Sequence, residues 1–186
     1  MKNLIQKVLV LSLLIILSIS TFAQMSGNMP VKSDSIKNSK KAVCQILPTQ
    51  GNVVTGKVTF EQTPVGVKVV VELKGLNPGK HGFHIHECGD CTAADGTSAG
   101  GHFNPEMASH GAPTDAMHHA GDMGNVDADA NGNVQLEYVD ASISLYGSQS
   151  IIGRSIIVHK SEDDMKTQPT GNSGARIACG VIGVSK

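Results

Sequence analysis

The chain lacks an excess of positive charge, a long apolar run and an early cysteine, and each absence argues against a class of protein. Its 186 residues include 15 basic and 16 acidic ones, a balance that gives no indication of nucleic-acid binding. The apolar stretch from Val8 to Ile19 is shorter than the about 20 residues that a membrane-spanning helix needs. The first cysteine is Cys44, which argues against a lipid anchor on a cysteine directly after that stretch.

The start of the chain has instead the layout of a secretory signal peptide. Two early lysines precede the apolar stretch, and Thr21 to Ala23 place small residues at the positions that a signal peptidase reads. We therefore expect residues 1–23 to be a signal peptide, residues 24–40 a flexible polar leader and residues 41–186 one domain. Cleavage would leave 13 basic and 16 acidic residues. The mature chain is expected to be exported, periplasmic or extracellular, and free of the membrane.

Alternation of apolar and polar residues predicts that the domain is all-β. Runs rich in β-branched residues alternate with period two and are separated by turn-forming residues. The eight expected strands cover residues 43–47, 54–61, 67–74, 81–87, 121–126, 134–138, 155–159 and 178–184. Short strands at regular spacing favour an antiparallel sandwich or barrel. Residues 88–120 and 160–175 do not alternate in this way, and long loops on a β domain are usually functional.

His102 is the most informative residue, because it lies between two groups of metal-type ligands. Upstream, His84 and His86 are two apart on an expected strand, so both side chains leave the same face. The lone His159 closes a later apolar run and completes a nitrogen-only set. Such a set suits copper.

The downstream group offers a different ligand chemistry. His110, His119 and Asp122 combine imidazole nitrogens with a carboxylate, which suits a closed tetrahedral zinc site. An imidazole has two nitrogens, so His102 could bind a metal on each side and belong to both groups. The neighbouring His118 and the earlier His81 are expected to be structural rather than ligating.

Five segments of the chain resemble, in order, the signatures of the copper–zinc superoxide dismutase family. They are residues 82–87, residues 96–105, the spacing of His110, His119 and Asp122, residues 153–159, and residues 174–183. The resemblance runs from about Lys41 to the end of the chain. It implies an eight-stranded antiparallel Greek-key sandwich or barrel with two long functional loops, one that binds metal and one that guides substrate.

The resemblance also implies the activity, which is dismutation of superoxide to oxygen and hydrogen peroxide. Copper would be held by His84, His86, His102 and His159, and zinc by His102, His110, His119 and Asp122. On reduction of copper, His102 would take up a proton while staying on zinc. Arg176 would orient superoxide, since a guanidinium is always charged and weakly hydrated; a hydrogen bond to loop carbonyls or a surface ion pair is its alternative role. Asp163 would join a copper ligand to a zinc ligand.

A disulfide between the metal loop and the last strand is a further implication of the resemblance. Cys179 matches its second member, and an exported chain can keep such a bond. Cys91 is the expected first member, because its early place in the loop is similar to the bacterial branch of the family. Cys88 is the competing candidate.

The chain departs from the better-known eukaryotic pattern of that family in three places. Residues 164–170 form a short guiding loop without that branch's glutamate pair and lysine, and Lys166 is a candidate substitute. Cys88 and Lys57 stand where that branch's dimer contact has an aromatic and an apolar residue, which leaves a homodimer open. A non-catalytic copper or zinc store is the competing function, although relatives of that kind lack some copper ligands or the arginine.

Overall fold

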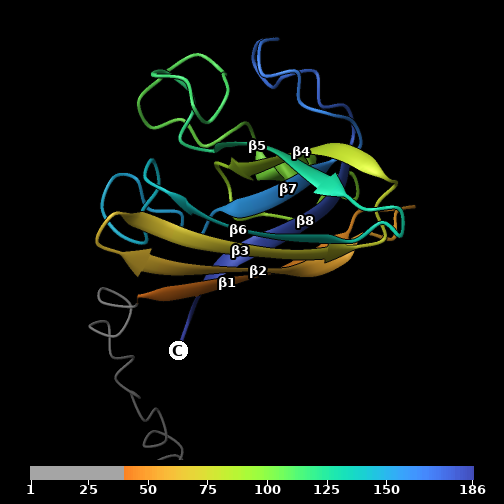
Figure 1. Cartoon of the computed structure of the whole chain (residues 1–186), viewed down its shortest axis with the longest axis horizontal. Coiled ribbons are helices and arrows are strands. Elements are labelled where there is room, and N and C mark those ends of the chain that lie inside the picture. Colours follow the sequence, from red (N-terminus) through yellow and green to blue (C-terminus); the bar gives the residue numbers. More distant parts are fainter. Residues whose placement is uncertain (1–39) are drawn as a thin grey trace, which may run out of the picture. The chain divides into compact units, whose positions relative to one another are not determined.

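Eight strands form the framework of the computed structural model, which describes residues 40–186 (Figure 1). Their bounds are β1 (Lys41–Pro48), β2 (Thr55–Thr63), β3 (Gly66–Lys74), β4 (Gly79–His86), β5 (Asp122–Ala128), β6 (Val134–Asp140), β7 (Ser155–His159) and β8 (Arg176–Ser185). Each strand overlaps one that the sequence predicts. The predicted signal peptide, and all of the predicted leader except residue 40, lie outside the described residues.

The order of the strands closes the sheet almost completely into a barrel. Neighbours run β5-β4-β7-β8-β1-β2-β3-β6, and each neighbouring pair is antiparallel. The chain leaves β3 to form β4 on the far part of the sheet and returns to place β6 beside β3, a crossover pattern of the Greek-key kind. The all-β prediction is confirmed. Among residues 40–186, no helix is long and apolar enough to cross a membrane.

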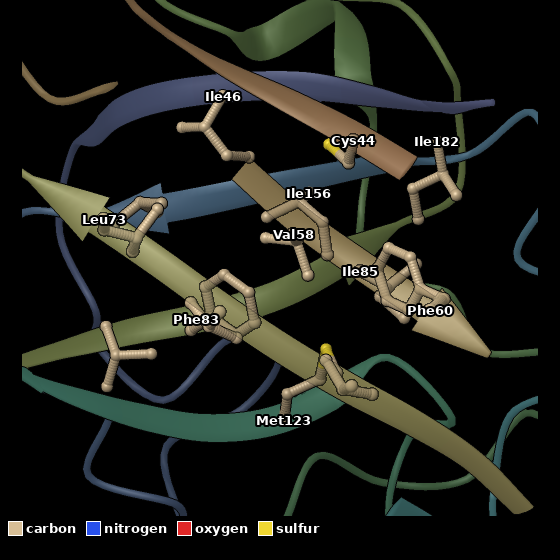
Figure 2. Packing of buried hydrophobic residues seen from close by; sticks show 14 of the residues in the cluster. Cys44, Ile46, Val58, Phe60, Leu73, Phe83, Ile85, Met123, Ile156 and Ile182 are labelled. Carbon is tan, nitrogen blue, oxygen red and sulfur yellow. The ribbon is translucent and has the colours of Figure 1, made fainter. Parts of the chain in front are cut away.

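The core follows from the alternation of side chains along the strands. On β3, the alternate residues Val67, Val69 and Val71 are fully buried, because successive side chains of a strand point to opposite faces. Figure 2 shows Phe60 and Phe83 reaching into the same interior from different strands. Each such burial stabilises the fold by roughly 1.5–3 kcal/mol.

Strand β4 differs from its neighbours, because it is buried on both faces. Phe83 and Ile85 point into the barrel, while His84 and His86 leave the opposite face and are nevertheless 0% exposed. Two of the three long segments between strands, residues 87–121 and 160–175, lie on that outer side of β4, β5 and β7 (Figure 1), while the third, residues 141–154, joins β6 to β7. The first two segments cover the histidine face of β4, so that both faces of the strand are buried.

A disulfide ties the first of these loops to the last strand. Cys91 and Cys179 are bonded, with an S–S distance of 1.96 Å, so the predicted pairing is confirmed over the Cys88 alternative. Cys88 is free and exposed, and Cys44 is free and buried. Burial raises the pKa of the Cys44 thiol to about 12, with a smaller opposing effect of a backbone hydrogen bond, so that thiol is unreactive at neutral pH.

Replacing both Cys91 and Cys179 by serine should lower the free energy of unfolding by roughly 4 kcal/mol, because the bond spans 88 residues and restricts the unfolded chain. Denaturant titration of the metal-free protein measures this without a contribution from bound metal. Cys88→Ser is the matched control, since its exposed free thiol predicts a change below about 0.5 kcal/mol. Equal losses in the two variants would contradict a stabilising role of the disulfide.

Candidate metal centre

The position of His102 is set by a short extension of β4. Residues His86 and His102 form an isolated antiparallel bridge. The backbone N–H of Phe103 donates to Ile85 O at 2.8 Å, and that of Glu87 donates to the carbonyl before His102 at 2.9 Å. The loop therefore returns along the end of β4, and its histidine is held against the two histidines of that strand.

The ring of His102 lies in the middle of the cluster. Its centroid is 4.1 Å from that of His84 and 5.0 Å from that of His86. On its other side, the rings of His110 and His119 lie at 5.4 and 5.5 Å. The structure thus brings the two predicted groups together with His102 between them.

Asp122 organises the downstream group. Its Oδ2 accepts hydrogen bonds from the backbone N–H groups of Gly111 at 3.1 Å and His119 at 2.8 Å. This leaves Oδ1 facing three ring nitrogens, the Nδ1 atoms of His102, His110 and His119, at 2.7, 3.0 and 3.2 Å. The Nδ1 atoms of His102 and His119 are 3.4 Å apart.

The contacts of His110 and His119, at 3.0 to 3.4 Å, fit ligands around one small ion, whereas the 2.7 Å contact of His102 Nδ1 with Asp122 is a hydrogen bond. Zinc–nitrogen bonds of 2.0–2.1 Å place tetrahedral ligands about 3.3 Å from each other. The 3.0 Å contact of His110 Nδ1 with Asp122 is not oriented as a hydrogen bond, since that nitrogen has no hydrogen-bond partner among the described residues. Two ligand-type atoms at this distance that are not hydrogen-bonded to each other are an arrangement that fits a shared metal.

The upstream group offers four buried nitrogens that lack a partner. Among residues 40–186, no hydrogen bond reaches His84 Nδ1, His86 Nε2, His102 Nε2 or His159 Nε2. All four residues are at most 6% exposed, and their ligand atoms lie within 4.8 Å of one another. Buried polar atoms without partners are rare and costly, so this convergence fits an all-nitrogen metal site of the kind that copper takes.

The other nitrogen of each upstream ring is already fixed. His86 Nδ1 donates to Gly100 O at 2.9 Å, and His159 Nδ1 donates to Gly174 O at 3.2 Å. Such bonds set the tautomer and leave the remaining nitrogen available to bind a metal. The carbonyls that do this belong to glycines, which the sequence reasoning did not single out as functional.

Asp163 links the two groups. Its Oδ2 accepts a hydrogen bond from His84 Nε2 at 2.7 Å, and its Oδ1 accepts one from His110 Nε2 at 3.0 Å. The carboxylate is buried in the second long loop. One residue therefore orients a ring of each predicted metal set.

Burial keeps the upstream rings in the form that binds metal. It lowers the pKa of His84 to about 4, despite the opposing hydrogen bond of Asp163, and that of His159 to about 3. Burial also lowers the pKa of His86 well below its usual value. These rings are neutral at neutral pH, and a neutral imidazole is the ligand form.

The downstream group is negatively charged, because its carboxylates stay ionised. Burial acts to raise the pKa values of Asp122 and Asp163, but hydrogen bonds with the histidines outweigh it and hold both pKa values well below the usual range. Burial lowers the pKa of His110, yet the two carboxylates outweigh it and raise the pKa to about 9. The site therefore carries two carboxylates that could balance a dication, and a metal at Nδ1 of His110 would have to displace a proton.

Arg176 lies beside the upstream group at the start of β8. Its Nη1 donates to Gly96 O at 2.8 Å and its Nη2 to Gly100 O at 2.7 Å. The carbonyl of Gly100 is also the acceptor for His86, so the guanidinium and that ring share one anchor. Hydrogen bonding to loop carbonyls, the alternative role of this arginine, is therefore present, but it uses only two of five N–H donors.

Three residues that the sequence raised stand outside the two clusters. His118 Nδ1 contacts His119 O at 2.7 Å, and both ring nitrogens of His81 lie 2.9 Å from backbone carbonyls. Neither belongs to a group that could hold a metal. The third, Lys166, is exposed, and its backbone N–H donates to Asp164 Oδ1 at 2.9 Å.

Comparisons with known proteins agree with this geometry. The sequence model of the family described as copper/zinc superoxide dismutase (SODC) matches residues 54–182. An extracellular superoxide dismutase [Cu-Zn] of Drosophila melanogaster is 42% identical over 95% of this chain and 97% of its own length. A superoxide dismutase [Cu-Zn] of Schizosaccharomyces pombe is 50% identical over 71% and 91%.

A solved structure, that of the clock protein EA4, is also similar. It superimposes with a TM-score of 0.73 at 41% identity and covers 79% of this chain and 96% of its own. The family match spans well over half of the chain and includes both ligand clusters. The chain belongs to the copper/zinc superoxide dismutase family.

Proposed function

We propose that the chain dismutates superoxide at a copper–zinc centre that shares His102. Copper would be held by His84 Nδ1 and by the Nε2 atoms of His86, His102 and His159; zinc would be held by Asp122 Oδ1 and by the Nδ1 atoms of His102, His110 and His119. The observation that carries this assignment is that His102 presents Nδ1 to the zinc group while its Nε2 is buried without a partner on the copper side.

Bound copper would supply the one-electron chemistry, oxidising one superoxide to oxygen and reducing another to hydrogen peroxide. The chain supplies proton handling through His102. Its Nε2 is the atom that can take up a proton and pass it on, while Nδ1 keeps the ring in place on the Asp122 side. A general acid fixed on one side and free on the other can move its proton without reorganising the site.

Arg176 would bind and orient the anion. The two hydrogen bonds to loop carbonyls hold the guanidinium beside His86, and its remaining donors can face a small anion. Electrostatic attraction of this kind raises the rate of encounter. Asp163 would act on orientation, since it fixes the rings of His84 and His110 together.

A non-catalytic metal store is the second candidate function. The chain argues against it because it has groups that catalysis needs and storage does not. A metal store needs ligands. It does not need an imidazole that is shared between two metals and has a free nitrogen for a proton, as in His102, or a guanidinium held next to the copper side, as in Arg176. Both are present in this chain. Superoxide turnover by copper-loaded protein separates the two functions.

Export of the chain is supported by the disulfide and by the predicted signal peptide. A stable disulfide is typical of oxidising compartments, and a similar protein is named extracellular. The signal peptide leaves a periplasmic and an extracellular location open. The finer expectation, an enzyme of the bacterial exported type, rests on the early position of Cys91, whereas the relatives named above come from a fly and a fission yeast. A homodimer remains the assembly to test by light scattering.

The mature chain should begin near Gln24. The small residues before it match what a signal peptidase reads. Terminal sequencing of protein recovered from the exported fraction checks this. Recovery of a chain that still begins at Met1 would contradict it.

His102→Ala should abolish dismutation and weaken binding of both metals, because one ring serves both groups. Elemental analysis of the wild-type protein should give one copper and one zinc per chain, and metal titration of the variant should show both losses. His118→Ala is the control, since that ring belongs to neither cluster. Loss of only one metal from His102→Ala would overturn the shared site.

Arg176→Ala should lower the second-order rate about tenfold or more, a loss on the order of 1.4 kcal/mol in transition-state stabilisation, while both metals stay bound. Arg176→Glu should be slower still, and the wild-type rate should fall with rising salt. Pulse radiolysis with parallel metal analysis measures both quantities. An unchanged rate at full metal content would assign Arg176 to loop structure alone.

A further inference from the structure

Gln168 pairs with the backbone of His110 in both directions. Its side-chain Oε1 accepts a hydrogen bond from His110 N at 2.8 Å, and its Nε2 donates to His110 O at 2.8 Å. A primary amide is the side chain that offers a donor and an acceptor in one plane. It therefore replaces the strand partner that this loop residue does not have.

Asn125 makes the same kind of contact with Asp163, the residue that hydrogen-bonds the ring of His110. Its Nδ2 donates to Asp163 O at 2.9 Å, and its Oδ1 accepts from Asp163 N at 2.8 Å. Since the side chains of Asp163 and His110 are themselves bonded at 3.0 Å, the backbones of both partners are held by amides. The hydrogen bond between Asp163 and His110 is therefore held in place at both of its residues.

The backbone of the second loop also lies directly against this pair. Gly171 has a φ of +67°, and a Cβ atom there would collide with Asp163 Oδ1 and His110 Nε2. The loop therefore contacts His110 twice, with Gly171 near its ring and with Gln168 on its backbone. Gln168 is itself exposed, so its amide closes the contact from the solvent side.

We propose that Gln168 is a positioning residue for the zinc side of the centre. The proposal rests on the assignment of His110 as a zinc ligand. By holding the N–H and C=O of His110, the amide limits how the ring can swing and presents Nδ1 to the other ligands before metal arrives. Ligand groups that are ordered in advance bind more tightly, because less freedom is lost on binding.

The test compares two glutamines of the same chain. Gln168→Met keeps the length of the side chain and removes both hydrogen bonds to His110, together with the longer bond that Nε2 donates to Lys166 O at 3.3 Å. Gln168→Glu keeps the acceptor but sets a carboxylate oxygen against His110 O. Gln62→Met is the matched control, since Gln62 also bonds a distant segment through its amide, with Oε1 accepting from Leu145 N at 2.9 Å, and belongs to neither cluster.

Zinc affinity is measured on metal-depleted protein by competition with a chromophoric chelator, and Co²⁺ in the zinc site reports ligand geometry by its visible spectrum. We expect Gln168→Met and Gln168→Glu to raise the zinc dissociation constant about tenfold, the lower end of the range for residues that orient a ligand. We also expect both variants to shift the Co²⁺ spectrum. Gln62→Met should change neither quantity, even if both methionine variants lower the unfolding midpoint.

The proposal would be overturned if Gln168→Met binds zinc within twofold of Gln62→Met and its Co²⁺ spectrum is not shifted relative to that control. His110→Ala, measured in parallel, separates this outcome from failure of the zinc assignment. If His110→Ala weakens zinc and Gln168→Met does not, only the positioning role is wrong. If His110→Ala leaves zinc affinity unchanged, the ligand assignment is wrong and the role of Gln168 is overturned with it.

Discussion

The structure depends on a buried cluster of six histidines and two aspartates whose polar atoms must all find partners. Burial of an unsatisfied donor or acceptor costs about 1–3 kcal/mol, and four ring nitrogens on the upstream side have no partner within the described chain. Metal ions would satisfy these nitrogens. Metal binding and stability would therefore be coupled in this fold, because the same groups that could bind the ions cost stability while their ring nitrogens lack partners.

The barrel supplies the rigid side of that cluster. His84, His86 and His159 leave strands that are hydrogen-bonded to each other, and Asp122 begins the neighbouring β5 at the register position of His84. The remaining members of the two groups come from a loop that has little secondary structure of its own. The loop is fixed at separate points, by the disulfide of Cys91, by the bridge at His102 and by the second loop around His110.

Much of the fold was predictable, because alternation of side chains is a local property of a strand. The runs at residues 54–61 and 67–74 are strands with nearly the predicted bounds. The two ligand groups were predicted from ligand chemistry and from resemblance, and the disulfide from resemblance alone. The structure joins Cys91 to Cys179 and brings the members of each group together. Spacing did not reveal the parts played by Gln168 and Asn125, since an amide that bonds a distant backbone has no local sequence pattern.

The sequence by itself determined the strand pattern, the two long loops and the residue types at the site, since periodicity and ligand chemistry are written in neighbouring residues. Only the tertiary structure decided which atoms face each other. It placed Nδ1 of His102 toward Asp122 and Nε2 toward the copper side, and it set Asp163 between His84 and His110. The physical reason is that these contacts join segments up to 79 residues apart in the chain, so that only the packing of the barrel and its loops brings them within bonding distance.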